Sequence, residues 1–130
     1  MAEARKFSIA ARLRSFYFAA RGIKTMLLSQ HNAWVHVVAT VLVIALGLTA
    51  GLTRLEWFVL TLAIMAVWMA ESINTAFEFL CDVTSPEFHP LVEKAKDVAA
   101  GAVLIAAIGA TAIGALVFVP YVCELFGVSW

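Results

Sequence analysis

Apolar positions along the chain form three long runs that contain no Asp, Glu, Lys or Arg. The runs are residues 32–53, 57–70 and 98–123. A helix rises by about 1.5 Å per residue, so the first and last runs are each long enough to cross about 30 Å of hydrocarbon. These two runs therefore predict transmembrane helices.

The middle run crosses a bilayer only if its helix continues toward Asp82. That continuation contains carboxylates, which a membrane tolerates only near one face or inside a helix bundle. We expect transmembrane helices over residues 32–53, 55–81 and 97–122. With the segment that precedes them, they form a single all-α integral membrane domain over residues 1–130.

The segment before the first run has helical periodicity of its own. Its apolar positions fall on one side of a helix and its basic positions on the other. The apolar positions are Leu13, Phe16, Tyr17, Ala20, Ile23 and Leu27, and the basic ones are Arg14, Arg21 and Lys24. We expect an amphipathic surface helix within residues 1–29, with its basic face toward anionic headgroups, nucleotide phosphates or both. A simple membrane anchor explains this segment, taken alone, equally well.

Composition and charge agree with a membrane protein of defined orientation. The chain is 63% hydrophobic and only 14% charged, which lies outside the range of soluble globular proteins. Its nine basic and nine acidic residues cancel, so no net charge points to nucleic acid. Most of the bases precede residue 25, and Lys94 and Lys96 follow the second span, whereas the turn at 51–55 holds only Arg54. This distribution predicts a cytoplasmic N-terminus and a C-terminus outside.

The third run is rich in alanine and glycine, which let helices approach closely. Three helices are few for shielding the polar second span. We therefore expect a homo-oligomer with sites shared between subunits.

One stripe of the second span carries the candidate chemistry. Glu71, Asn74, Glu78 and Asp82 follow one another at i, i+3, i+7 and i+11, which aligns them on one helix face. Glu71 is about 22 Å along the helix axis from Glu56, near the inner edge of the hydrocarbon. A deeper carboxylate can accept a proton while a shallower one binds a hard cation through oxygen. The stripe therefore predicts a site that both a lipid headgroup and a cytosolic nucleotide can reach.

Cationic groups open the third span on the same side. Lys96, followed directly by Asp97, is a candidate contact for an anionic nucleotide. We interpret Lys94 as a residue that sets topology.

Two blocks of sequence at this end of the molecule resemble a known family. Residues 71–78 read ESINTAFE, with Asp82 following, and residues 87–104 read EFHPLVEKAKDVAAGAVL. Both blocks, their spacing and the approach to the first span at residues 30–36 resemble the small prokaryotic integral-membrane kinases that include diacylglycerol kinase and undecaprenol kinase. The resemblance covers nearly the whole chain.

The resemblance implies a homotrimer in the bacterial inner membrane, with active sites between neighbouring subunits, that uses ATP and Mg2+ without a Walker loop. By position, Glu71 resembles the proton acceptor for the lipid hydroxyl. Gln30 and Glu78 resemble the metal ligands. The resemblance further implies nucleotide contacts at Arg12, Arg14, Gln30, Asn74, Glu78, Glu87, His89, Lys96 and Asp97, and lipid contacts at Trp34, Glu71 and Ala100.

One position departs from the family pattern. The family often has a glutamate as a metal ligand before the first span, and this chain has Gln30 there. An amide oxygen binds magnesium less strongly than a carboxylate does.

The pattern and the resemblance together predict an ATP- and Mg-dependent kinase that phosphorylates a lipid alcohol by in-line transfer. Within the family, residues 88–91, FHPL, together with residues 95–104, AKDVAAGAVL, resemble the undecaprenol-kinase branch more than the diacylglycerol-kinase branch. The resemblance therefore favours undecaprenol as the lipid, with diacylglycerol as the alternative. A small transporter is the competing class, because intramembrane carboxylates also mark ion paths. Its carboxylate would lie nearer the midplane. A structural or regulatory membrane subunit is the third reading, and it gives the acidic stripe no purpose.

Overall fold

The computed structural model describes residues 8–127, which form four α-helices. They are α1 (Ile9–Ser29), α2 (His31–Ala50), α3 (Arg54–Thr84) and α4 (Pro90–Leu125). Helices α2, α3 and α4 are long and apolar enough to span a membrane. The predicted all-α fold with three such helices is therefore confirmed. Residues 1–7 of the predicted surface region lie outside the described residues.

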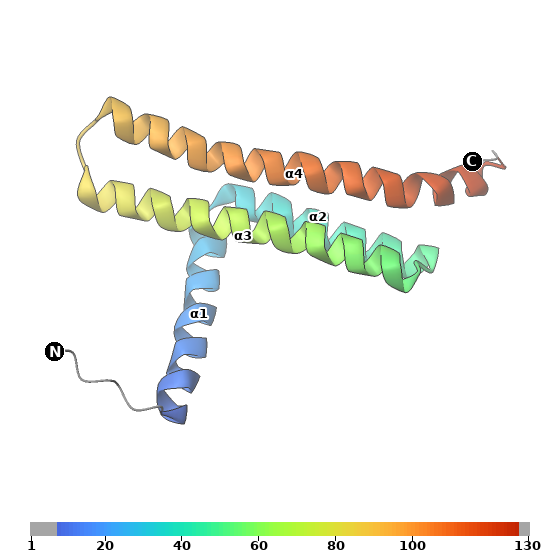
Figure 1. The fold of residues 1–130 in the computed structure, drawn as a ribbon, viewed down its shortest axis with the longest axis horizontal. Coiled ribbons are helices and arrows are strands. Elements are labelled where there is room, and N and C mark those ends of the chain that lie inside the picture. Colours follow the sequence, from blue (N-terminus) through green and yellow to red (C-terminus); the bar gives the residue numbers. More distant parts are fainter. Residues whose placement is uncertain (1–7, 128–130) are drawn as a thin grey trace.

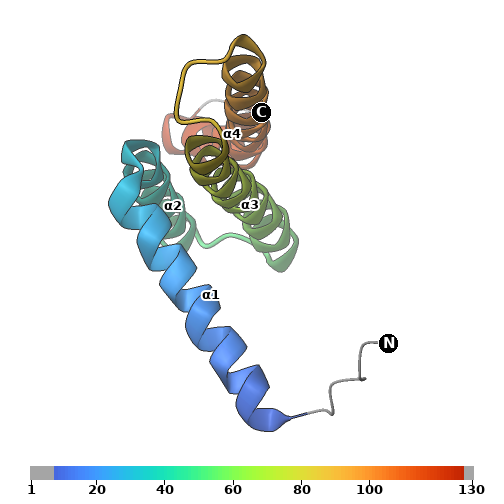
Figure 2. The same ribbon diagram turned by 90° about the vertical axis from the view of Figure 1, so that its left-hand side faces the viewer.

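Helices α3 and α4 run antiparallel and side by side along the long axis of the molecule, while α2 packs against α3 (Figure 1). Helix α1 leaves this bundle at a steep angle, and Figure 2 shows it extending away from the ends of the other helices. Within α1 only Met26 is buried, and apolar side chains such as Leu13 and Phe16 are exposed. This helix therefore contributes little to the packing of the single chain.

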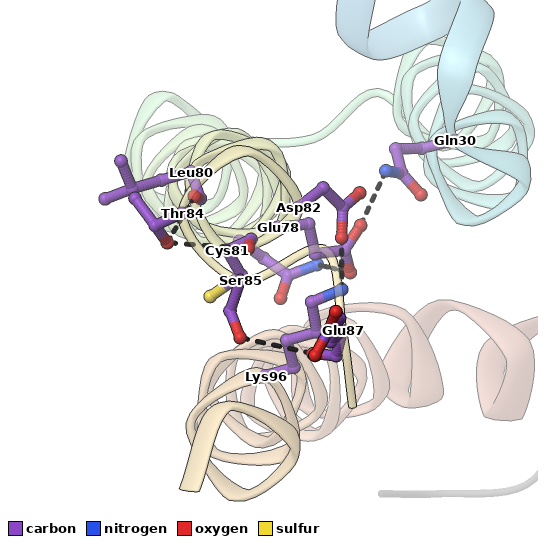
Figure 3. A network of polar contacts seen from close by, with 10 residues as sticks. Gln30, Glu78, Leu80, Cys81, Asp82, Thr84, Ser85, Glu87 and Lys96 are labelled. Carbon is purple, nitrogen blue, oxygen red and sulfur yellow. Dashed lines mark hydrogen bonds and ion pairs between the residues drawn. The ribbon is translucent and has the colours of Figure 1, made fainter. Parts of the chain in front are cut away.

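A single extended residue separates the first two helices. Gln30 has φ −113° and ψ 119°, so it ends α1 and begins α2. The change of direction at Gln30 turns α1 out of the bundle. It also holds the Gln30 side chain beside Glu78, near the C-terminal end of α3 (Figure 3).

The turn between α2 and α3 is fixed by backbone conformation and side-chain capping. Gly51 ends α2 at φ 69°, a left-handed conformation that costs glycine little. Thr53 and Glu56 then form a capping box at the start of α3. The hydroxyl of Tyr121 donates to Glu56 Oε2 at 2.8 Å, so α4 is tied to the same turn.

The apolar core lies at this turn. Leu52, Leu60 and Val117 are buried there, and Trp57 packs close to Gly47. The polar stripe of α3 occupies the opposite end of that helix, so apolar packing holds one end of the bundle and leaves the other for chemistry.

Candidate active site

A cavity of about 240 Å³ lies between α2, α3 and α4. Its apolar lining comes mainly from α4. Its polar lining consists of Asn32 and His36 from α2 and Glu71, Asn74 and Glu78 from α3. Successive turns of α3 thus present three of the four residues of the predicted stripe, Glu71, Asn74 and Glu78, to one half-open cavity.

Glu71 is the most deeply buried polar residue of this cavity. It is only 1% exposed, and neither of its carboxylate oxygens has a hydrogen-bond partner. Asn74 Oδ1 and His36 Nε2 are also buried without a partner. Buried polar groups are nearly always satisfied, because each unpaired group costs about 1–3 kcal/mol. Unpaired groups that converge on one cavity are typical of a site that binds a polar ligand.

Glu78 lines the same cavity two helical turns from Glu71, and two amides hold it. Gln30 Nε2 donates to Glu78 Oε2 at 2.7 Å (Figure 3). Asn74 Nδ2 donates to Glu78 Oε1 at 3.0 Å. The two predicted metal ligands, far apart in sequence, are therefore direct neighbours.

Magnesium is a hard cation that prefers oxygen ligands, and the groups around Glu78 can supply them once the amides turn over. Glu78 offers a carboxylate, Gln30 and Asn74 present their amide nitrogens to it, and Asn74 Oδ1 is buried without a partner. Within residues 8–127 no group of three or more His, Cys, Asp and Glu side chains is arranged to hold a metal. A cation here would therefore depend on amide oxygens and water as well as on Glu78.

A second, more open pocket of about 510 Å³ adjoins the loop between α3 and α4. Four predicted nucleotide contacts line it: Glu87, His89, Lys96 and Asp97. The Lys96 ammonium pairs with Asp82 Oδ1 at 2.5 Å, across from α4 to α3 (Figure 3). Asp82 is one helical turn beyond Glu78, so the two pockets follow one another along α3.

His89 also has a structural part in this pocket. Its Nδ1 accepts a hydrogen bond from the backbone N–H of Leu91 at 3.2 Å, and Pro90 occupies the first position of α4. These two residues are a helix start signal, which explains why α4 begins ahead of Lys96.

Other predicted site residues lie elsewhere in the chain. Ala100 lines the Glu71 cavity, whereas Trp34 is 56% exposed on α2. Arg12 and Arg14 lie in the first two turns of α1, and the N-terminal part of α1 extends away from the other helices (Figure 1). Within one chain, then, Glu71, Asn74, Glu78 and Ala100 share one cavity and the loop residues share the adjoining pocket, whereas Trp34 and the arginines line neither.

Several residues of the site were not among the predicted contacts, and two of them contact a predicted residue directly. His36 reaches Glu71, and Asp82, although part of the predicted stripe, is the partner of Lys96. A sequence signal for His36 exists. Asn32, His36 and Thr40 recur every four residues in an otherwise apolar span, and polar side chains in such a span face protein.

These features define an all-helical membrane protein with a carboxylate-containing site at one end of its bundle. Residues 17–118 match the sequence pattern of the prokaryotic diacylglycerol kinases, and the chain belongs to this family. It is a lipid kinase of a bacterial membrane, with a lipid and ATP as its substrates.

Individual relatives carry two different names. An undecaprenol kinase of Bacillus subtilis is 36% identical over 107 residues, which cover 82% of this chain and 87% of the relative. A diacylglycerol kinase of Synechocystis is 36% identical over 114 residues, 87% of this chain and 65% of the relative. A diacylglycerol kinase of Helicobacter pylori is 32% identical over 92 residues, 71% of this chain and 72% of the relative. Family membership favours the kinase over the transporter and the structural subunit.

Proposed function

We propose that the cavity around Glu71 is where the lipid hydroxyl is phosphorylated, with Glu71 as the proton acceptor. The observation that carries this proposal is the pair of unbonded carboxylate oxygens on a side chain that is 1% exposed. A hydroxyl group that entered the cavity would satisfy one of these oxygens by donating its proton. Ala100 lies in the same lining, and Trp34 borders the lipid on the outer face of α2.

The nucleotide occupies the adjoining pocket in this proposal. Lys96, now paired with Asp82, exchanges this partner for phosphate oxygens, and Asp97, Glu87 and His89 surround the rest of the nucleotide. Because Asp82 and Glu78 are one turn apart, the terminal phosphate can extend from this pocket toward Glu71.

Gln30 and Glu78 would hold magnesium between the two pockets, with Asn74 beside them. The ion, when bound, neutralises phosphate charge.

The chain's own groups then perform an in-line transfer. The O–H bond of the lipid breaks as its proton passes to Glu71. The lipid oxygen forms a bond to the γ-phosphorus, and the bond to the ADP oxygen breaks. Lys96 stabilises the phosphate charge, so positioning and electrostatics provide most of the rate enhancement.

The assembly we propose is a homotrimer in the inner membrane with α1 on the cytoplasmic surface. Two observations support it. Helix α4 has only two buried residues in the single chain, and its glycines have open space beside them. Arg12 and Arg14 belong to the first turns of α1 and line neither pocket of their own chain, and the N-terminal part of α1 points away from the bundle (Figure 1), so in this proposal they reach the phosphates in the site of a neighbouring subunit.

For the lipid, we propose undecaprenol, with diacylglycerol as the alternative. The loop sequence FHPL supports undecaprenol, and the Bacillus subtilis relative named undecaprenol kinase is matched over most of its length. Both lipids present a single primary hydroxyl to the site.

The test measures transfer of the labelled γ-phosphate of ATP to each lipid by the purified protein, together with its Glu71→Gln variant. We expect faster transfer to undecaprenol and a fall in turnover of about 100-fold or more in the variant, since a general base contributes about 10²–10⁴-fold. Near-normal turnover by a folded Glu71→Gln protein would remove Glu71 from the mechanism. Faster transfer to diacylglycerol would reverse the lipid assignment alone.

A further inference from the structure

His36 projects from α2 into the same cavity as Glu71, although it was no part of the predicted site. Its Nε2 lies 3.8 Å from Glu71 Oε2, and both atoms are buried without a hydrogen-bond partner. The distance is within range of an ion pair but longer than a hydrogen bond. Such contacts in active sites commonly shorten when substrate binds.

The neighbours of the imidazole hold its ring in this orientation. Trp68 packs edge-on against it, with ring centroids 6.2 Å apart and planes at 72°. Trp68 is itself fixed, because its Nε1 donates to Thr40 Oγ1 at 3.1 Å, one turn along α2 from His36. The ring therefore has little freedom to turn away from Glu71.

Other groups around the cavity offer the imidazole no better partner. The α4 side contributes apolar residues such as Val103 and Leu104. On α3, Glu78 already accepts hydrogen bonds from Gln30 and Asn74. The unpaired acceptors that remain are Asn74 Oδ1 and the Glu71 carboxylate, and Glu71 Oε2 lies 3.8 Å from His36 Nε2.

We propose that His36 is a positioning residue for Glu71, a role that rests on the proposed function of Glu71 as proton acceptor. The Nε2–H of the imidazole donates to Oε2 and thereby aims Oε1 at the lipid hydroxyl. Without this donor the buried carboxylate can rotate, and its desolvation is not compensated. The position of His36 relative to Glu71 resembles the way other catalytic groups are oriented by a third residue.

Two substitutions of His36 distinguish an effect of its N–H donor on Glu71 from an effect of its bulk on packing. His36→Gln keeps an N–H donor at a reach similar to that of Nε2, whereas His36→Leu keeps bulk and removes the donor. Thr49→Val is the control, because it also removes a side-chain hydrogen bond from α2, but Thr49 bonds only to the backbone of its own helix and does not line the Glu71 cavity.

Steady-state rates of the folded proteins give the first readout. We expect His36→Leu to lower kcat roughly 10- to 100-fold, the value of one hydrogen bond to a charged group, with little change in KM for ATP. His36→Gln should recover most of this loss, and Thr49→Val should match the parent. Equal losses in the Gln and Leu variants, or full activity in His36→Leu, would overturn the proposal. If His36→Leu and Glu71→Gln are both fully active, the proposed function of Glu71 is wrong. If His36→Leu is fully active and Glu71→Gln is inactive, only the proposed role of His36 is wrong.

A spectroscopic readout works even if His36→Leu does not fold. Selective 15N labelling of histidine reports on three residues, His31, His36 and His89, and His36→Gln identifies the resonances of His36. We expect Nε2 of His36 to carry a proton in the parent and its resonance to shift in Glu71→Gln. An unprotonated Nε2, or a resonance unchanged by Glu71→Gln, would contradict the proposed contact.

Discussion

Gln30 stands where the family often has a glutamate as a metal ligand, and it lies beside Glu78. The effect of this amide on magnesium binding can therefore be tested by substitution. The amide of Gln30 donates to Glu78, so Gln30→Glu would replace a hydrogen bond by two adjacent carboxylates. Two carboxylates repel each other without a cation and bind one strongly when it is present.

We predict that Gln30→Glu lowers the magnesium concentration for half-maximal activity several-fold and lowers the Tm in EDTA. Glu78→Gln should raise that concentration sharply or abolish turnover. Activity measured against magnesium concentration and thermal melts with and without EDTA check these predictions for both variants. Glu124→Gln is the control, because it removes a carboxylate near the C-terminal end of α4, away from the site. Unchanged magnesium dependence in both folded variants would eliminate this pair as the metal site.

Helical spacing in the sequence predicts which residues of one helix share a face, but not what they contact on other helices. Helical spacing alone aligned Glu71, Asn74 and Glu78, and these residues do line one cavity. The contacts of Gln30 with Glu78 and of His36 with Glu71 join different helices. Local spacing along α3 carries no information on them.

At the scale of elements, the packing of α2 on α3 depends on one glycine. Gly47 is buried, and a Cβ added there would lie 2.7 Å from Trp57 Cη2 and 3.0 Å from Leu52 Cδ1. A contact this short forces the indole ring or α2 itself to move.

We predict that Gly47→Ala destabilises the protein by about 1–3 kcal/mol, the usual cost of overpacking. Gly22→Ala is the control, since Gly22 lies within α1 and has open space around it. Alanine there should be neutral or slightly stabilising because it favours the helix. The check is unfolding of both variants in detergent micelles, and equal stability of Gly47→Ala and the parent would show that α2 does not pack this closely.

Helix boundaries illustrate how capping acts at this scale. The predicted first span extends to residue 53, whereas α2 ends at Ala50, because Gly51 adopts a left-handed conformation and Thr53 caps the next helix. Helix α4 begins at Pro90, ahead of the predicted span at residue 97. A membrane span and its helix have different limits, since the helix continues into water where caps and turns end it.

At the scale of the whole molecule, orientation in the membrane is the property to test. The two cysteines lie near opposite ends of the bundle, Cys81 in the last turn of α3 and Cys123 in the last turn of α4. Cys81 is buried and Cys123 is partly exposed.

We predict that Cys123 faces the outside of the membrane. In a Cys81→Ala background, a membrane-impermeant thiol reagent should label Cys123 in intact spheroplasts. The matched variant also carries Cys123→Ala and Ser15→Cys on α1, and it should be labelled only after lysis. Labelling of Cys123 solely after lysis would refute the three-span orientation.

The sequence by itself determined the helical, membrane-spanning class and the residues of the acidic stripe. Apolar run length and helical periodicity are local properties, and the lipid solvent leaves a lone segment few alternatives to the helix. Only the tertiary structure decided that Gln30 meets Glu78, that His36 meets Glu71 and that Lys96 pairs with Asp82. Each of these contacts depends on the rotation and register of one helix against another, which are set by close packing such as that of Trp57 on Gly47 and not by the period of any single helix.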